Sequence, residues 1–274
     1  MRTPAEIIAN RSTFSIGLAL SDGWKLVSKY LLYYILGGII TIVISMAVSL
    51  IPIAGGIIDK VILSPCLMAG AVYVTWRISK GLGWTDFGDM FKGFNFLRPV
   101  ALSTLIEGFA IIILTILILF NNLQELFDLY KLTQRLDPYN TGDQEQLRHA
   151  FLQMMDSKFI VSLLLLLVAF LVISCVWAFK IHFIVIYKME AWPAMEMSRK
   201  IAANNFLPLI GLFLLLTLII VFSALPCGIG LLFSLPLSIG ATYSAFAQIT
   251  NCDQPDEINK DMFDFIGDAN SNKA

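Results

Sequence analysis

The chain has 274 residues, of which 57% are hydrophobic and 14% are charged, whereas about 25% of the residues of a soluble domain are charged. Its net charge is −1, and it has no basic run and no alternation of aromatic and basic residues, so nucleic acid is excluded as a partner. With a mean hydropathy of +0.76, this composition predicts an all-helical protein embedded in a lipid bilayer.

Apolar segments predict six transmembrane helices. The longest segment without a charged side chain has 52 residues, from Ile201 to Cys252, about twice the ~20 residues that cross a bilayer as a helix. A segment of this length is expected to fold back on itself within the lipid. The six expected spans cover residues 30–51, 57–77, 99–120, 159–181, 207–225 and 228–250.

Two segments beside these spans are expected to be amphipathic helices that lie in the membrane interface rather than across it. Their apolar residues recur at helical spacing, as Ile16, Leu20, Trp24, Val27 and Leu31 in the first and as Trp84, Phe87, Phe91 and Phe94 in the second. Aromatic side chains favour that depth. The alternative for the second segment, residues 82–96, is a helix that binds a partner in a groove.

Short uncharged turns predict that the first and last pairs of spans are helical hairpins. Adjacent to the first turn, Asp59 and Lys60 point about 100° apart on a helix, so we expect them to anchor this end at the outer interface. The residues that mark the turns are Pro52, Gly55 and Gly56 in the first hairpin and Pro226 and Gly228 in the last.

The two hairpins resemble each other and predict an internal duplication. In the second helix of each, a proline, Pro65 or Pro236, is followed by a glycine and a tyrosine. Both copies enter the membrane from the same side, so the predicted repeat is parallel, unlike the inverted repeat of many transporters. The two prolines either break their helices and expose carbonyls to a cavity, or kink helices whose carbonyls are satisfied by neighbours.

Between the third and fourth spans, residues 121–158 form a long polar segment. Helices are expected over residues 123–132 and 144–155, separated by a turn at residues 137–142 that contains proline, asparagine and glycine.

Lysine and arginine set the expected orientation, because cytoplasmic flanks carry an excess of these residues. The N-terminus lacks the apolar core and cleavage site of a signal peptide, so the first span should be an uncleaved insertion signal and the mature chain should begin at or near Met1. Residues 121–158 then face outward and both termini are cytoplasmic. Fourteen basic residues fall on the cytoplasmic side and five, Lys60, Lys131, Arg135, Arg148 and Lys158, on the other.

Glu107 is the main candidate for an intramembrane polar site, because it lies within an otherwise apolar span. An ionised carboxylate is costly there, so Glu107 should be protonated, paired or in a wet cavity. A contact with Lys180 or His182 would serve proton or substrate movement, or else only orient two helices. Taken alone, Lys180 would extend its ammonium to the lipid headgroups, and His182 would be a structural histidine.

No catalytic, cofactor or metal signature accompanies the hydrophobic segments. The two histidines are too few for a histidine-rich metal site, and the four cysteines show no Cys-x-x-Cys or Cys/His grouping. The glycines suit close helix approach and tight turns rather than phosphate binding. We therefore expect no cofactor, no metal ion and no disulfide.

The second hairpin carries a pattern of small and polar residues, namely Ala194 to Ser198, Asn204, Asn205, Phe206, Pro226, Gly228, Gly230, Pro236, Gly240 and Tyr243. A weaker version of the pattern runs from Ala19 to Tyr73. This pattern resembles that of a broad group of uncharacterised bacterial integral-membrane proteins, which are related to the membrane domain of some glycerophosphodiester phosphodiesterases. The resemblance implies a location in the bacterial cytoplasmic (inner) membrane and no particular reaction, since the catalytic barrel is absent.

Residues 1–274 are expected to form a single membrane domain. The acidic tail is either solvated, with one turn docked on the surface, or binds a cytosolic partner. The expected parts are a first hairpin with its lead-in helix (12–78), an interfacial helix and third span (79–120), an extracytoplasmic helical segment (121–158), a fourth span (159–190), a second hairpin (191–250) and the tail (251–274).

The expected function is that of a non-enzymatic scaffold or accessory component, with the lipid bilayer and other membrane proteins as partners. The reason is that intramembrane ionisable groups other than Glu107 lie near the interfaces. The alternative is a carrier or channel for a small solute or lipid, in which Glu107 and the proline-containing spans line a pathway. A lipid-acting enzyme is a third candidate and would need two convergent ionisable side chains beside an acyl-sized groove.

Overall fold

The computed structural model describes residues 3–9, 12–52, 54–136, 140–225 and 228–253, which form helices and no strands and so confirm the all-helical prediction. Pro226, Cys227, the first half of the turn at 137–142 and the tail after Asp253 lie outside the described residues. In chain order the helices are α1 (Pro4–Ala9), α2 (Ile16–Ser28), α3 (Leu31–Ser49), α4 (Ala54–Ile58), the π-helical turn η1 (Asp59–Leu63), α5 (Ser64–Ser79), the 3-10 helices η2 (Phe87–Phe96) and η3 (Phe120–Asn122) on either side of α6 (Leu97–Leu119), α7 (Leu123–Thr133), α8 (Thr141–Met154), α9 (Ser157–Val176), α10 (Lys180–Ile186), α11 (Ala191–Asn204), α12 (Phe206–Ala224) and α13 (Leu231–Thr250).

Five helical runs of the described chain are long and apolar enough to cross a membrane, and they coincide with the first five expected spans. The sixth expected span coincides with α13, in which polar side chains such as Ser234, Thr242 and Gln248 lower the apolar content. A sixth crossing therefore stays a prediction. The five runs are Leu31–Ser49, Ala54–Ser79, Phe87–Leu119, Ser157–Ile186 and Phe206–Ala224.

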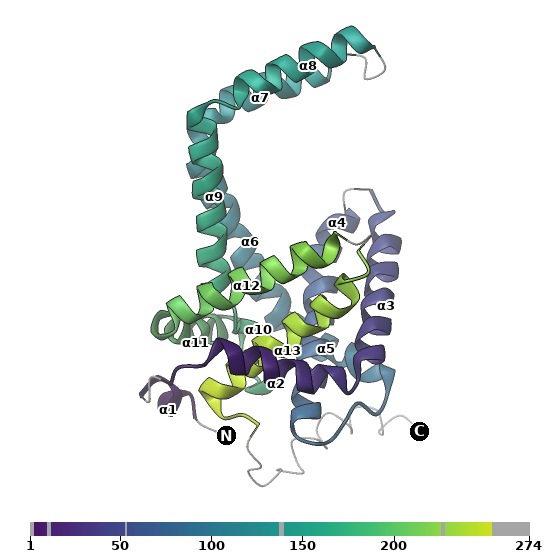
Figure 1. The fold of residues 1–274 in the computed structure, drawn as a ribbon, viewed down its shortest axis with the longest axis vertical. Coiled ribbons are helices and arrows are strands. Elements are labelled where there is room, and N and C mark those ends of the chain that lie inside the picture. The colour runs from purple at the N-terminus through teal and green to yellow at the C-terminus, as the bar shows by residue number, and fades with distance from the viewer. Residues whose placement is uncertain (1–2, 10–11, 53, 137–139, 226–227, 254–274) are drawn as a thin grey trace.

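Helix α2 packs along α13 through small residues (Figure 1). The buried stripe of α2 consists of Ala19, Gly23 and Val27, which are spaced four residues apart on one face. Gly23 meets Gly240 of α13 so closely that neither position has room for a Cβ. Val27 of the expected stripe belongs to this contact, because its Cγ2 lies 2.5 Å from the place of a Cβ on Gly240. Trp24 instead stays 39% exposed, where lipid would meet it.

The segment 82–96 packs against α3 and α5 instead of standing apart from the bundle. The Trp84 ring is 5% exposed, and its centroid lies 5.0 Å from that of Tyr34 and 5.4 Å from that of Tyr33, both in α3. Farther along, Gly93 of η2 lies against Gly70 of α5 without space for a Cβ on either residue. Part of the predicted aromatic stripe thus fills the interior of the protein.

A buried carboxylate fastens η2 to the end of α5. Asp89 is 3% exposed and accepts hydrogen bonds from Nη1 of Arg77 at 2.6 Å and from the Thr85 hydroxyl at 3.2 Å. Its second oxygen pairs with the ammonium of Lys92 at 2.9 Å. Because the donors come from both elements, they fix the position of η2 on α5.

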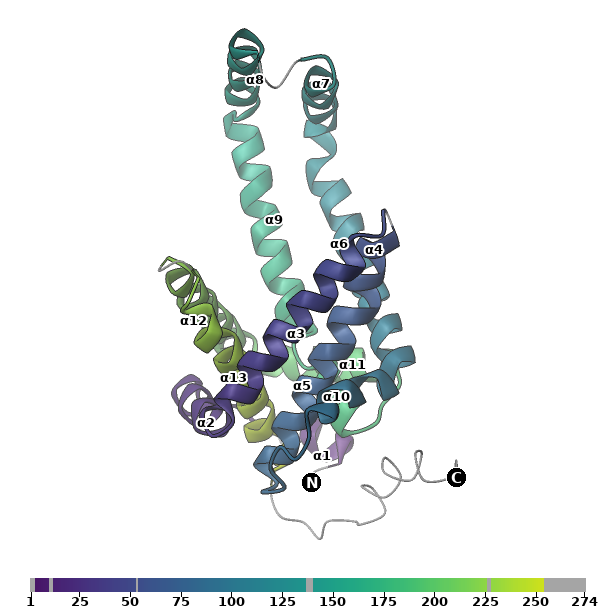
Figure 2. The ribbon, with the colours of Figure 1, turned by 90° about the vertical axis from the view of Figure 1, so that its right-hand side faces the viewer.

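Helices α6 and α9 rise side by side from the rest of the bundle and carry α7 and α8 at their far end (Figure 2). In Figure 1, α7 and α8 bend away from the direction of α6 and α9. Asp156 caps the start of α9 by accepting from the amide of Phe159 at 2.8 Å, and the Ser162 hydroxyl donates to Asn122 of η3 at 2.9 Å. Helices α7 and α8 occupy the two stretches for which helices were predicted.

Large apolar side chains remain exposed along α3, α6, α9 and α12. In a bilayer these faces contact acyl chains, since lipid replaces water around an apolar helix. Representative residues are Ile42, Met46, Phe109, Ile113, Leu167, Phe170, Leu218 and Phe222, each at least 53% exposed.

Candidate functional site

The fourth expected span is interrupted, because α9 ends at Val176 and α10 begins at Lys180. Ser198 of α11 satisfies the backbone at this break. Its hydroxyl accepts from the amide of Phe179 at 3.1 Å and donates to the carbonyl of Val176 at 2.9 Å. Ser198 is fully buried, so water does not compete for these groups. The break starts a new helix with Lys180 inside the protein.

Lys180 and Glu107 form an ion pair that joins α10 to α6. The Nζ of Lys180 donates to Oε2 of Glu107 and, at 3.4 Å, to the carbonyl oxygen of Ser103. Ser103 and Glu107 are four residues apart and therefore share one face of α6. The side chain of Lys180 is 7% exposed and that of Glu107 is 24% exposed. Pairing offsets part of the cost of placing both charges in apolar surroundings.

The expectation that Lys180 extends to the lipid headgroups is wrong. Its ammonium is held inside the bundle because the carboxylate of Glu107 and the Ser103 carbonyl supply acceptors there. A lysine side chain usually extends so that its charge stays in water, but here the two acceptors bind the charge within the bundle.

His182 lies apart from this pair, in an aromatic cluster. Its side chain is 2% exposed, and its ring centroid lies 5.1 Å from that of Phe246, 5.8 Å from that of Phe179 and 6.4 Å from that of Tyr243. Neither ring nitrogen has a hydrogen-bond partner within the described ranges. Of the two contacts considered for Glu107, the structure therefore brings Lys180 to the carboxylate and packs His182 into the core.

A polar hollow of about 770 Å³ lies beside α2 and α13. At its edge the Tyr243 hydroxyl is 2.6 Å from the Ser79 hydroxyl and 3.7 Å from the Cys252 sulfur, so it links α5, α13 and the residues after α13. The ammonium of Lys25 pairs with Asp22 at 2.9 Å on the α2 side. This hollow has both charges and hydroxyls, but Glu107 does not line it.

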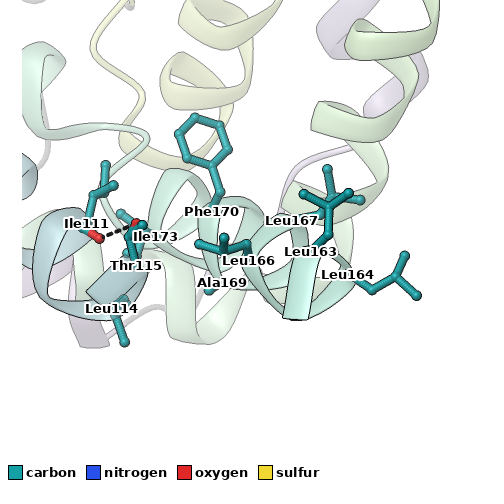
Figure 3. Close-up of a pocket in the computed structure, with 10 residues that line it drawn as sticks. All are labelled: Ile111, Leu114, Thr115, Leu163, Leu164, Leu166, Leu167, Ala169, Phe170 and Ile173. Carbon is teal, nitrogen blue, oxygen red and sulfur yellow. Dashed lines mark hydrogen bonds between the residues drawn. The ribbon is translucent and has the colours of Figure 1, made fainter. Parts of the chain in front are cut away.

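An apolar cavity of about 470 Å³ lies between α6 and α9 (Figure 3). On the α6 side it begins at Ile111, one helical turn beyond Glu107, and its single hydroxyl, that of Thr115, donates to the Ile111 carbonyl at 2.8 Å. The α9 side consists of leucines together with Ala169, Phe170 and Ile173. The cavity suits a hydrocarbon chain and offers no group for binding a charged solute.

The residues predicted to form turns and helix breaks occupy different settings. Gly55 and Gly56 lie inside α4, so the first turn is shorter than expected, and Gly55 sits against the Val48 carbonyl. Gly228 has φ +76° in the turn before α13. Pro52 lies in the first turn, Pro65 lies at the start of α5 after the π-helical turn η1, and α13 runs through Pro236 without interruption.

The roles of two polar features, Ser198 and the hydroxyls around Asp59, were not predicted from the sequence. Ser198 acts on a break in another helix, and nothing in its local sequence signals this role. The hydroxyls around Asp59 do have a signal, since Thr41, Ser45 and Ser49 recur every fourth residue and therefore line one face of α3. In the described part of the chain, no three His, Cys, Asp or Glu side chains gather where they would hold a metal ion.

Comparisons of the chain with models of protein families, with curated proteins and with solved structures find no match. The interpretation of the Glu107–Lys180 pair and of the hollows therefore rests on their geometry and on the composition of the surrounding helices.

Proposed function

We propose that the chain is a multi-pass protein of the bacterial cytoplasmic membrane that serves as a non-enzymatic scaffold or accessory component. The observation that carries this proposal is the ion pair between Glu107, in the middle of α6, and Lys180. A carboxylate that moves protons or solutes needs water or a second partner. Here the carboxylate has a basic partner whose ammonium also bonds the Ser103 carbonyl, an arrangement suited to holding α6 and α10 together.

The proposed topology has six spans, with α13 as the sixth, and places both termini on the cytoplasmic side. It is supported by the excess of lysine and arginine in the segments assigned to that side. In this topology, helices α7 and α8 lie on the extracytoplasmic side of the membrane, at the far end of α6 and α9.

The proposed parallel duplication pairs α2, α3 and α5 with α11, α12 and α13, which follow in the same order along the chain. Gly70 of α5 and Gly240 of α13 support this pairing, because each lies against the backbone of another segment. Gly70 contacts the carbonyl of Met90 in η2, and Gly240 contacts the carbonyl of Gly23 in α2. Relation to the membrane domain of glycerophosphodiester phosphodiesterases is part of the same proposal.

Helices α7 and α8 supply a surface for the scaffold function. Phe127 and Tyr130 of α7 are 55% and 59% exposed, and Phe151 and Leu152 of α8 are 46% and 56% exposed. Aromatic side chains at a surface that carries few other apolar groups are typical of protein interfaces. We propose that another membrane protein covers them.

The scaffold proposal is tested by purifying the full chain in a gentle detergent and identifying proteins that remain bound in stoichiometric amount. We expect a partner that is retained by the wild type and lost when Phe127 and Tyr130 are both replaced by Ser. Replacement of Asp128 by Asn on the same helix is the matched control and should retain it. Solute uptake by vesicles that contain the chain alone, abolished by Glu107→Gln, would instead establish a carrier.

A lipid carrier is the second candidate, and the apolar cavity between α6 and α9 favours it (Figure 3). An acyl chain would occupy the space beside Ile111, Ala169 and Phe170. Such a carrier is expected to speed exchange of labelled lipid between the leaflets of reconstituted vesicles. Ala169→Trp should fill the cavity and stop the exchange, whereas equal exchange rates for both proteins would remove this candidate.

A further inference from the structure

A shallow hollow of about 480 Å³, lined by hydroxyl, charged and apolar side chains, lies between α3, the π-helical turn η1 and the start of α5. Ser49 is the last residue of α3, and Thr41 lies about 12 Å nearer the middle of the helix. With 19 residues, α3 is about 28 Å long, close to the thickness of the hydrocarbon core. The hollow therefore begins at the level of the lipid headgroups and extends toward the acyl chains.

Asp59 provides an acceptor at the base of this hollow. Its side chain is buried, with the residue 8% exposed, and its Oδ1 accepts from the Ser45 hydroxyl at 2.7 Å and from the Ser64 hydroxyl at 3.1 Å. An ionised carboxylate accepts about four hydrogen bonds, so two serines leave capacity for a further donor. Among the described residues, no lysine, arginine or histidine forms an ion pair with it.

The π-helical turn and the proline after it account for the position of Asp59. In η1 the amide of Ser64 bonds the carbonyl of Asp59, five residues earlier, and Pro65 has no amide hydrogen with which to restore the α-helical pattern. The turn places Asp59 opposite the hydroxyls of α3. Single π-helical turns of this kind occur frequently at functional sites.

Lys60 lines the same hollow, but it is exposed, and its ammonium makes no ion pair with Asp59. A positive and a negative group thus stand apart on neighbouring residues. A bare cation would be attracted by Asp59 and repelled by Lys60, whereas an anion would be repelled by Asp59. A zwitterion with separated charges complements both groups.

The apolar rim indicates how the rest of such a molecule would lie. Ile42 and Met46 also line the hollow and are 56% and 67% exposed on the face of α3 that lipid would contact. They allow hydrocarbon to continue from the polar space along the helix.

We propose that this hollow binds the headgroup of a phospholipid that carries a primary amine, of the ethanolamine class. The ammonium donates to the free acceptor positions of Asp59, the phosphate lies at Lys60, and the acyl chains follow Ile42 and Met46. The serine hydroxyls hold the carboxylate in place for the ammonium, since both bond its Oδ1. The proposal is independent of the scaffold function, because the hollow lies between α3, η1 and α5 and includes none of the residues of α7 and α8 proposed for the scaffold surface.

The test is native mass spectrometry of the full chain in detergent with phosphatidylethanolamine, phosphatidylcholine or phosphatidylglycerol of matched acyl chains. We expect the ethanolamine lipid to bind about tenfold more tightly than the choline lipid, whose quaternary ammonium has no N–H to donate. Asp59→Asn should reduce this ratio to below twofold, and Asp128→Asn, an exposed carboxylate on α7, should leave it unchanged.

Lys60→Gln guards against a folding defect, because Lys60 is exposed and the fold does not depend on its charge. This variant should weaken the binding of phosphatidylethanolamine and of phosphatidylglycerol by a similar factor, since both lipids carry the phosphate. It should retain the preference for phosphatidylethanolamine over phosphatidylcholine. Equal binding of ethanolamine and choline lipids by the wild type overturns the proposal. So does stabilisation of the lipid-free protein by sodium ions that is lost in Asp59→Asn, which would assign the hollow to a cation.

Discussion

Gly23 of α2 and Gly240 of α13 pack backbone against backbone. A Cβ on Gly240 would lie 2.5 Å from the carbonyl oxygen of Gly23, and a Cβ on Gly23 would lie 2.5 Å from the carbonyl carbon of Gly240. Contacts of this length do not occur between real Cβ atoms and backbone, so the two helices must separate if either glycine gains a methyl group. The packing of the amphipathic lead-in on α13 depends on this pair.

Gly23→Ala should therefore destabilise the protein by about 1–3 kcal/mol, the usual cost of overpacking, as measured by thermal unfolding in detergent. Gly17→Ala is the matched control on the same helix, because nothing lies within 4 Å of its Cβ position. It should stabilise the helix slightly, since alanine is the better helix former. A Gly23→Ala protein as stable as the Gly17→Ala protein would contradict the close packing of α2 on α13.

The Glu107–Lys180 pair predicts strong coupling between two residues 73 positions apart in the chain. Glu107→Ala leaves the ammonium of Lys180 buried without its carboxylate and should cost about 3–5 kcal/mol. The double variant Glu107→Ala with Lys180→Met should recover most of that loss, because no buried charge remains. Unfolding temperatures of the single and double variants, treated as a double-mutant cycle, measure this coupling.

The exposed pair of Glu145 and Arg148 on α8 is the control for that experiment. Removing either charge should leave the unfolding temperature nearly unchanged, since water screens both side chains. If Glu107→Ala behaved like Glu145→Ala, the ion pair would not hold α6 to α10.

Ser198→Ala tests the bridge across the break between α9 and α10. The variant leaves the amide of Phe179 and the carbonyl of Val176 without their partner in a buried position, which should cost about 1–3 kcal/mol. Hydrogen exchange at Phe179 should become faster. Ser238→Ala removes an exposed hydroxyl that bonds only its own helix, and it should leave the exchange of Phe179 unchanged.

The proposed orientation predicts which engineered thiols react with an impermeant reagent added to intact cells. A cysteine at Asn140, at the exposed start of α8, should be labelled from outside, and one at Lys29, after α2, should not. The experiment uses a Cys227→Ser background. The native thiols of Cys66, Cys175 and Cys252 are buried, and burial raises the pKa of the Cys252 thiol to about 11, so it stays protonated and unreactive near pH 8. Labelling at Lys29 alone would reverse the topology.

Much of the helical layout was predictable, because long apolar segments and turn residues act locally. The expected span at 99–120 coincides with the main part of α6, and the expected helices at 123–132 and 144–155 coincide with α7 and α8. The interruption at Trp177 to Phe179 was not predictable, since the groups that stabilise it belong to Ser198 of another helix. The three residues of the break, Trp177, Ala178 and Phe179, are apolar and include no proline or glycine that would signal the end of a helix.

In the candidate site, too, the sequence predicted some features and left others to the packing of distant segments. Glu107 stood out because a carboxylate in an apolar span needs a partner, but spacing along the chain did not choose between Lys180 and His182. The buried position of Asp59 was missed, since a charged residue next to a turn ordinarily lies at the interface. Its place opposite Ser45 depends on the π-helical turn.

The amino-acid sequence by itself determined the solvent, the helical class and the positions at which charge is costly, because these follow from the free energy of transferring each segment into lipid. Only the tertiary structure decided which partners those charges have, which stripe of α2 is buried and where a helix is interrupted. These depend on the distances between side chains far apart in the chain, and packing, rather than local composition, sets those distances.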